Sequence, residues 1–200
     1  MRSKIKKVAN EINLSKNNLD RFLDESFRVV WEPEFEERYQ RRAKKLGDAF
    51  EVVFDVTVDN LYPEVSSRME KNVSLEEACM SGGGEADFVI FGDEFPRDII
   101  AVIEAKGSAK KVEYEGRTIE VTDRPGIMRT DTIKKAISNA FQSKTAYPNS
   151  LFFIVTSHVP SSGNAKCMCD LAEGEIVDKI VNMKRGSDLQ KMVKMVKEKI

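Results

Sequence analysis

The sequence predicts an α/β fold in which helices flank a central mixed β-sheet. Residues 99–103 and 151–155 form short apolar runs without a polar face, and such runs are typical of central strands covered on both sides. Between them, residues 130–144 place apolar side chains at steps of three and four, the spacing of an amphipathic helix. A strand, a helix and another strand in that order indicate an α/β sandwich.

The chain before residue 60 is expected to be helical. Apolar residues recur at helical spacing within residues 1–30, and more clearly from Pro33, which suits a first helical turn, to Phe54. The β-branched content rises over residues 52–58, so this helix either continues there or passes into a strand. Residues 60–85 look irregular and end in three glycines, residues 82–84, which predict a mobile loop or a plain linker.

The remaining elements follow from turn signals and periodicity. Residues 86–91 and 98–106 are predicted to be strands joined by a turn rich in Gly, Asp and Pro. Residues 112–114 and 118–121 flank Glu115-Gly116 as an exposed hairpin. Thr130 or Asp131 is a candidate cap for the next helix. Two amphipathic helices are expected near the C-terminus, over residues 175–183 and 188–199.

Length and composition indicate one domain. The 200 residues are 41% hydrophobic, which is enough to bury a sizeable core. We expect a helical extension over residues 1–32, a core over 33–158 and C-terminal helices over 159–200. No apolar run approaches the ~18 residues of a membrane span, and residues 1–15 lack the apolar stretch of a signal peptide. A cytoplasmic protein without membrane association is therefore expected.

The cysteines do not predict a disulfide framework, because there are three of them. Cys167 and Cys169, together with His158, suggest a zinc site only weakly, since the C-x-C spacing lacks a second ligand pair. Reduced, partly buried thiols are the better interpretation.

Three charged residues are notable for their positions. Glu104 and Lys106 end an otherwise apolar strand, and their spacing of two places both side chains on one face. Burying a charge is costly unless it is paired or bound to a metal. Asp87 lies on the preceding strand, and a hairpin would bring it alongside Glu104. We expect two carboxylates and a lysine to converge. The alternative is a structural salt bridge, with Asp87 capping a turn.

Such a group suits phosphodiester hydrolysis. A hard divalent cation held by carboxylates activates water and stabilises the developing charge. Mg²⁺ accepts one or two carboxylates, and a nearby lysine can orient the attacking water. The residues resemble the PD-(D/E)XK nuclease superfamily, whose pattern is Asp, a variable gap, then Glu/Asp-X-Lys. The matching segments are Glu85-Ala86-Asp87, in which Ala86 replaces proline, and Glu104-Ala105-Lys106.

The resemblance covers residues 33–158 and is strongest to type II restriction endonucleases. It implies a restriction-endonuclease-like fold and Mg²⁺ held by Asp87, Glu104 and the backbone carbonyl of Ala105, with Lys106 positioning water. Family members often add an acidic residue from the first helix, and Glu51 is the best candidate. Asp48 and Asp55 share a helical stripe with Glu51. A solvated acidic stripe is the alternative.

Net charge argues against a general polycation, because it is −1 over the chain. Residues 105–145, however, hold nine Lys/Arg and five Asp/Glu, and nucleic-acid binding depends on such local patches. The candidate DNA contacts in this stretch are Lys110, Lys111, Arg124, Arg129, Lys134 and Lys135. Arg124 and Arg129 flank a Pro-Gly loop that could reach base edges. A solvated loop and helix face is the alternative.

The sequence thus predicts a homodimeric, sequence-specific endonuclease that cuts double-stranded DNA with Mg²⁺ in restriction-modification defence. Two-fold symmetry would match two active sites to the antiparallel strands of a palindrome. A structure-selective nuclease, such as a junction-resolving or repair enzyme, is the enzymatic alternative. A non-catalytic DNA-binding module is the alternative of another class.

Overall fold

The computed structural model describes residues 1–32 and 39–200. The expected start of a helix near Pro33 therefore lies outside the described residues. The α-helices are α1 (Arg2–Glu11), α2 (Leu19–Val30), α3 (Tyr39–Leu61), α4 (Pro63–Ser66), α5 (Thr130–Ala146), α6 (Gly163–Ala172) and α7 (Gly186–Lys197). The strands are β1 (Met69–Val73), β2 (Ala86–Phe91), β3 (Ile99–Lys106), β4 (Lys111–Tyr114), β5 (Arg117–Glu120), β6 (Leu151–Thr156) and β7 (Lys179–Asn182).

A five-stranded mixed sheet forms the centre of the molecule. Its strand order is β1-β2-β3-β6-β7. The β1–β2 and β2–β3 pairs are antiparallel, and the β3–β6 and β6–β7 pairs are parallel. The predicted fold class, an α/β fold with a mixed sheet flanked by helices, is confirmed.

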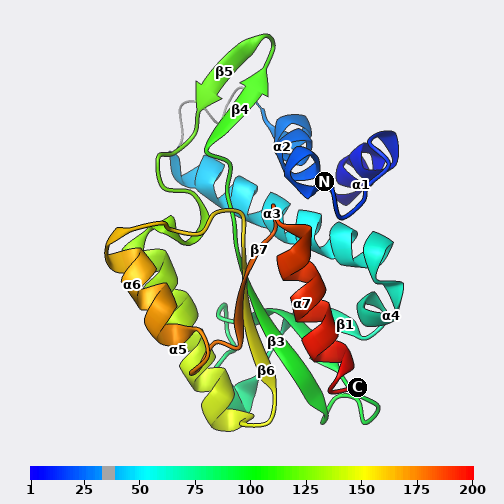
Figure 1. Ribbon diagram of the computed structural model, residues 1–200, viewed down its shortest axis with the longest axis vertical. Coiled ribbons are helices and arrows are strands. Elements are labelled where there is room, and N and C mark those ends of the chain that lie inside the picture. Colours follow the sequence, from blue (N-terminus) through cyan, green and yellow to red (C-terminus); the bar gives the residue numbers. More distant parts are fainter. Residues whose placement is uncertain (33–38) are drawn as a thin grey trace.

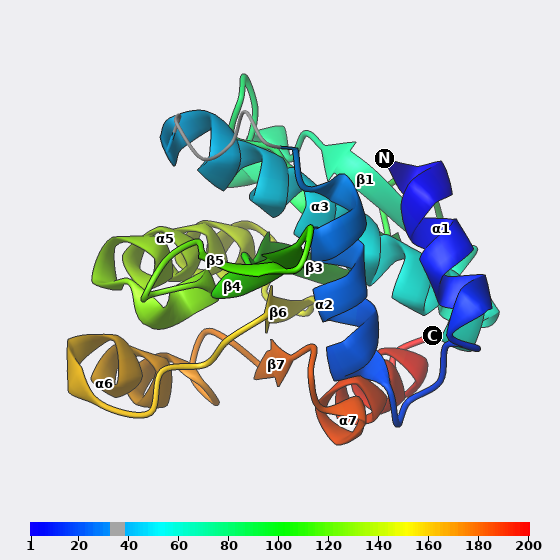
Figure 2. The same ribbon diagram turned by 90° about the horizontal axis from the view of Figure 1, so that it is seen from above.

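Helices cover both faces of this sheet, as Figures 1 and 2 show. Helices α5 and α6 pack on one face around an apolar cluster that includes Phe152 and Ile154. Helices α3 and α7 pack on the other face, with α1 and α2 outside them, around a cluster that includes Phe50, Phe88 and Phe153. Neighbouring residues of β6 thus point into different layers, which explains why its sequence is apolar without alternation.

Most expected elements are confirmed, with adjusted ends. The N-terminal thirty residues form α1 and α2, and the two strands around the Gly-Asp-Pro turn are β2 and β3. Helix α3 continues through its β-branched segment to Leu61, because Val53, Val56 and Val58 are fully buried there and packing overrides weak propensity. None of the helices within the described ranges is both long and apolar enough to cross a bilayer.

The C-terminal prediction was wrong for residues 175–183, where the structure has strand β7 in place of a helix. Ile180 and Val181 are neighbours buried in opposite layers, and periodicity alone cannot separate a short buried strand from a helix. Helix α6 was not expected, because its buried face consists of the small residues Ala165, Cys169 and Ala172.

Residues 60–85 contain more order than expected. They hold α4 and strand β1, which pairs with β2 at the edge of the main sheet. Strand β1 has the sequence Met-Glu-Lys-Asn-Val, with none of its residues fully buried. Polar residues are common on edge strands, so the hydrophobic pattern gave no signal.

The end of β3 is fixed by close backbone packing. A Cβ atom added to Gly107 would clash with the ring of Phe50, a residue with no exposed surface. Gly126 has a φ of +61° and lies against the backbone carbonyl of Lys106. Thr156 Oγ1 donates to that same carbonyl at 2.7 Å. Helix α3, the 122–129 loop and β6 therefore all meet where β3 ends.

We expect Gly107→Ala to destabilise the protein by about 1–3 kcal/mol, because an overpacked core must shift to relieve the contact. Gly47→Ala is the matched control. It lies in α3 with nothing within 4 Å of an added Cβ, so it should raise helix stability by up to about 1 kcal/mol. Urea unfolding of both variants measures the difference. Equal stabilities would show that Phe50 is not rigidly placed.

Candidate active site

The β2–β3 hairpin brings the two predicted carboxylates together. Phe88 pairs with Ile103 in the antiparallel register, and the next step of that register places Asp87 opposite Glu104. Asp87 Oδ2 accepts a hydrogen bond from the backbone N–H of Ala105 at 2.7 Å. The hairpin expected from the sequence is therefore present, and a side chain fastens its two strands beside the site.

The ammonium of Lys106 lies among three oxygen atoms. Nζ is 2.6 Å from Glu104 Oε1, 3.1 Å from Asp87 Oδ2 and 3.3 Å from the carbonyl oxygen of Ala105. These residues supply the same three groups that the nuclease resemblance assigns to Mg²⁺. The ammonium of Lys106 therefore lies among the oxygen atoms that are expected to bind Mg²⁺.

Burial makes this cluster sensitive to charge. Glu104 is only 2% exposed, and burial, reinforced by Asp87, raises its pKa despite the opposing effects of Lys106 and a hydrogen bond from Asn139. Burial disfavours the charged form of Lys106, but Glu104 and Asp87 outweigh it and raise the pKa of the ammonium. Lys106 therefore remains protonated at neutral pH.

Helix α3 adds Glu51 to the same region. Glu51 and Lys106 both line a cleft of about 610 Å³. Burial, followed by the charge of Asp87, raises the pKa of Glu51 from 4.5 to about 7, and Lys71 and Lys106 oppose the shift. Glu51 thus shares an electrostatic environment with the hairpin residues. The prediction that Glu51, on the helix that precedes the sheet, contributes an acid to this site is consistent with the geometry.

Two nearby residues were not foreseen. Lys71 of β1 lies over the Phe88 ring, 5.1 Å from its centroid, and burial lowers the pKa of its ammonium while Glu51 raises it. Asn139 of α5 hydrogen-bonds to Glu104. If β1 had been recognised as an edge strand paired with β2, Lys71 would have been expected near the site. Asn139 follows the apolar positions of a helix that was recognised, but nothing in the sequence relates it to Glu104.

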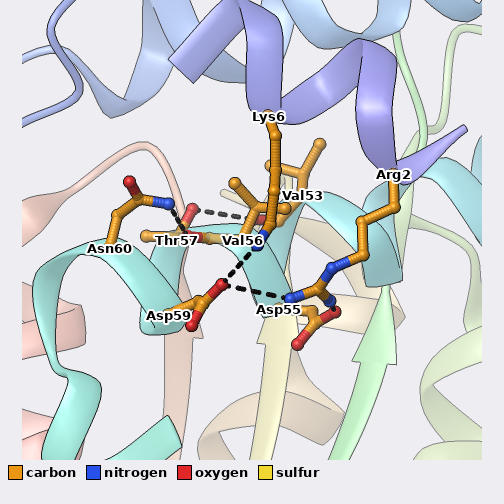
Figure 3. A network of polar contacts seen from close by, with 8 residues as sticks. All are labelled: Arg2, Lys6, Val53, Asp55, Val56, Thr57, Asp59 and Asn60. Carbon is orange, nitrogen blue, oxygen red and sulfur yellow. Dashed lines mark hydrogen bonds and ion pairs between the residues drawn. The ribbon is translucent and has the colours of Figure 1, made fainter. Parts of the chain in front are cut away.

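The acidic stripe on α3 is divided between two environments. Figure 3 shows Arg2 and Lys6 of α1 directed at Asp55 and Asp59. Arg2 forms ion pairs with both acids, and Lys6 lies 2.9 Å from Asp59. Asp55 is buried, so the solvated-stripe alternative is wrong for that residue. Helix α1 neutralises this part of the stripe, and Glu51 is left facing the cleft.

Half of the predicted DNA contacts line this cleft, namely Arg124, Arg129 and Lys135. Lys134 borders an adjoining hollow with the two arginines. Arg129 occupies the N-cap position of α5, whose end has no side-chain cap. Its guanidinium holds Asp131 at 2.8 Å, so the expected capping by Thr130 or Asp131 is replaced by this ion pair.

Lys110 and Lys111 lie elsewhere. They line a separate hollow beside His158, so the structure divides the predicted cations into two groups. Among the described residues, His158, Cys167 and Cys169 do not form a group that could hold a metal ion. Cys167 is exposed and Cys169 is buried, and burial raises the pKa of the Cys169 thiol to about 11.

The donor atoms at the hairpin fit a hard cation. Within residues 1–32 and 39–200, no three His, Cys, Asp or Glu side chains form a group that could hold a metal ion. Mg²⁺ does not require such a group, because it keeps several waters and accepts one or two carboxylates. Asp87, Glu104 and the Ala105 carbonyl supply oxygen alone, and they already surround a positive charge.

We expect Glu51→Gln to stabilise the protein at alkaline pH in the absence of divalent ions. The pKa of Glu51 is about 7 in the folded chain and 4.5 ordinarily, so ionisation opposes folding increasingly as pH rises through that window. Below the window the variant and the wild type should be equally stable. Denaturant titrations between about pH 5 and about pH 8 test this. A stability difference independent of pH would contradict the assignment.

Comparisons with known proteins identify no relative of this chain. The scan against family models and the searches of curated proteins and solved structures match nothing to this chain. The fold class is established by the sheet and its covering helices. The activity must be inferred from the residues at the end of the β2–β3 hairpin.

Proposed function

We propose that this chain is a Mg²⁺-dependent endonuclease that hydrolyses phosphodiester bonds in double-stranded DNA. The observation that carries the proposal is the convergence of Asp87 Oδ2, Glu104 Oε1 and the Ala105 carbonyl within 3.3 Å of one cationic nitrogen. Convergence of oxygen donors on one point is what a divalent cation requires.

The charge at this point supports the same conclusion. Two carboxylates share the single positive charge of Lys106, so the cluster carries net negative charge next to a cleft. The buried Glu104 lacks a second cation partner among the described residues. When bound, Mg²⁺ would supply Lewis-acid stabilisation of the phosphate and a water of lowered pKa.

The side chains have separate tasks in this proposal. Asp87 and Glu104 would bind the cation, and the hydrogen bond from the Ala105 N–H fixes the position of the Asp87 carboxylate. Lys106, which lines the cleft, would orient the attacking water. Glu51 lines the same cleft with a pKa of about 7, which allows it to exchange a proton near neutral pH.

The surroundings of the cleft suit a polyanionic substrate. Arg124, Arg129 and Lys135 line it, and cations of this kind bind the phosphate backbone irrespective of sequence. We propose further that two copies of the chain act together in restriction-modification defence, because a two-fold dimer presents two sites to antiparallel strands. Sedimentation with and without a DNA duplex tests the dimer.

Purified protein should nick or linearise plasmid DNA with Mg²⁺ and stop when the ion is chelated. We expect Asp87→Asn and Lys106→Met to lower the cleavage rate by about 100-fold or more, while DNA binding in gel-shift assays survives. Asp93→Asn is the matched control, because Asp93 lies in the turn of the same hairpin, is highly exposed and pairs with Arg68.

Cleavage by Lys106→Met at the wild-type rate would refute the catalytic assignment. Binding without Mg²⁺-dependent strand scission would favour the non-catalytic alternative. Discrete plasmid fragments indicate a restriction enzyme, whereas preference for branched DNA indicates a structure-selective nuclease.

The affinity for the ion should respond in opposite directions to two substitutions. In Lys106→Met, the competing ammonium is gone, and repulsion between an ammonium and a divalent cation about 4 Å apart is worth roughly 8 kcal/mol at an effective dielectric constant of about 20. We therefore expect Lys106→Met to bind Mg²⁺ at least about tenfold more tightly than the wild type, and Asp87→Asn to bind it more weakly. Titration calorimetry without DNA measures both. Unchanged affinities would place the ion elsewhere.

A further inference from the structure

A second, smaller hollow lies beyond the end of β3. It has a volume of about 230 Å³ and is bordered by α2, the start of β4 and the segments that follow β6 and β7. Its cationic lining residues are Arg28, Lys110, Lys111 and Lys184. His158 also lines it, and His158 is the only histidine of the chain.

The acidic residues of this hollow do not neutralise all of its cations. Glu25 pairs with Arg28 at 2.7 Å, and the carboxylate of Glu113 accepts a hydrogen bond from Thr118. Asp24 reaches Lys184 only at 3.7 Å and is 70% exposed. Within the described residues, no carboxylate forms an ion pair with either Lys110 or Lys111, so the hollow has surplus positive charge.

The imidazole of His158 is oriented by Ser157, which is itself hydrogen-bonded to Ser108. Ser157 Oγ donates to the carbonyl of Ser108 at 2.9 Å and accepts from its N–H at 3.0 Å. Because the hydroxyl proton is already used, His158 Nδ1, 3.0 Å from Oγ, is the donor in their contact. Nε2 is then the unprotonated nitrogen. Burial, followed by the charges of Lys184 and Lys110, lowers the pKa of His158 to about 4.

We propose that this hollow is a second phosphate-binding site, which holds a DNA backbone phosphate away from the scissile bond through Lys110, Lys184 and His158. The identity of the occupant rests on the proposed nuclease function. A phosphodiester supplies the negative charge that Lys110 lacks and that the exposed Asp24, 3.7 Å away, supplies only weakly to Lys184. Its oxygen accepts a hydrogen bond from Nε2 once that nitrogen is protonated. Phosphate binding and proton uptake by His158 are thus linked.

The position of the hollow fits one strand of a duplex. Lys110 follows Lys106 by four residues, so their Cα atoms are at most about 14 Å apart. His158 follows Thr156, which pairs with Lys106 in the parallel β3–β6 register. Successive nucleotides of one strand advance about 3.4 Å along the helix axis. The hollow is therefore close enough to the candidate active site for one DNA duplex to contact both.

Because the chain has one histidine, NMR of its imidazole reports on the hollow directly. At about pH 6 the free protein should show a neutral imidazole with Nδ1 protonated. Adding inorganic phosphate, and separately a short DNA duplex with Ca²⁺ in place of Mg²⁺ to prevent cutting, should shift the pKa of His158 from about 4 towards its ordinary 6.5. A duplex with uncharged methylphosphonate linkages should cause no shift.

Variants separate the hollow from the surrounding charge. We expect Lys110→Gln and Lys184→Gln to raise the pKa of His158 in the free protein and to reduce its response to phosphate. Each should also lower the slope of log binding constant against log salt for DNA by about one. Lys194→Gln is the control, because Lys194 is 78% exposed on α7, and it should leave the imidazole unchanged.

No imidazole shift with either ligand would overturn the proposal. A shift with inorganic phosphate but not with DNA would overturn the assignment of the occupant. Shifts with both ligands in a protein that never cuts DNA would refute the nuclease while supporting the hollow. Mg²⁺-dependent cutting without any imidazole shift would support the nuclease and refute the phosphate-binding role of the hollow.

Discussion

The buried Glu104 carboxylate and its contact with the Lys106 ammonium constrain the rest of this structure. A carboxylate that is 2% exposed is stable only beside a positive charge. Lys106 supplies that charge, and Asp87 and the Ala105 carbonyl complete its surroundings. The same arrangement that compensates the charge of the buried Glu104 collects the donor atoms of a cation site. Burial of this carboxylate and the proposed chemistry thus depend on one cluster.

The scaffold around this cluster is built to hold the end of β3 in place. Gly107 allows α3 to approach so closely that any side chain would meet Phe50. Thr156 joins β6 to the Lys106 carbonyl through a hydrogen bond, and Gly126 allows the 122–129 loop to approach the same carbonyl. Helix α3, the end of β3 and the 122–129 loop thereby bring polar side chains to a single cleft. The hydrogen bonds between Ser157 and Ser108 join the segments that follow β6 and β3, beside the second, basic hollow.

Charge is distributed along this edge with a clear division. Helix α1 neutralises Asp55 and Asp59 of α3 through Arg2 and Lys6, whereas Glu51 of the same helix is left in a partly buried cleft with a raised pKa. The cations form two groups, one lining the cleft and one lining the hollow at His158. Negative groups thus gather where a metal ion is proposed, and positive groups gather where phosphates are proposed.

The sequence by itself determined the fold class and the meeting of Asp87, Glu104 and Lys106. Both depend on short-range rules, namely the alternation of side chains along a strand and the pairing of neighbouring strands in a hairpin. It did not identify β1 or β7, because a polar edge strand and a four-residue buried strand lack a distinctive period. Only the tertiary structure decided that Lys71 and Asn139 join the site, that Asp55 is buried, and that Lys110 and Lys111 lie with His158 in another hollow. Those placements depend on contacts between segments far apart in the chain, which no local pattern of residues encodes.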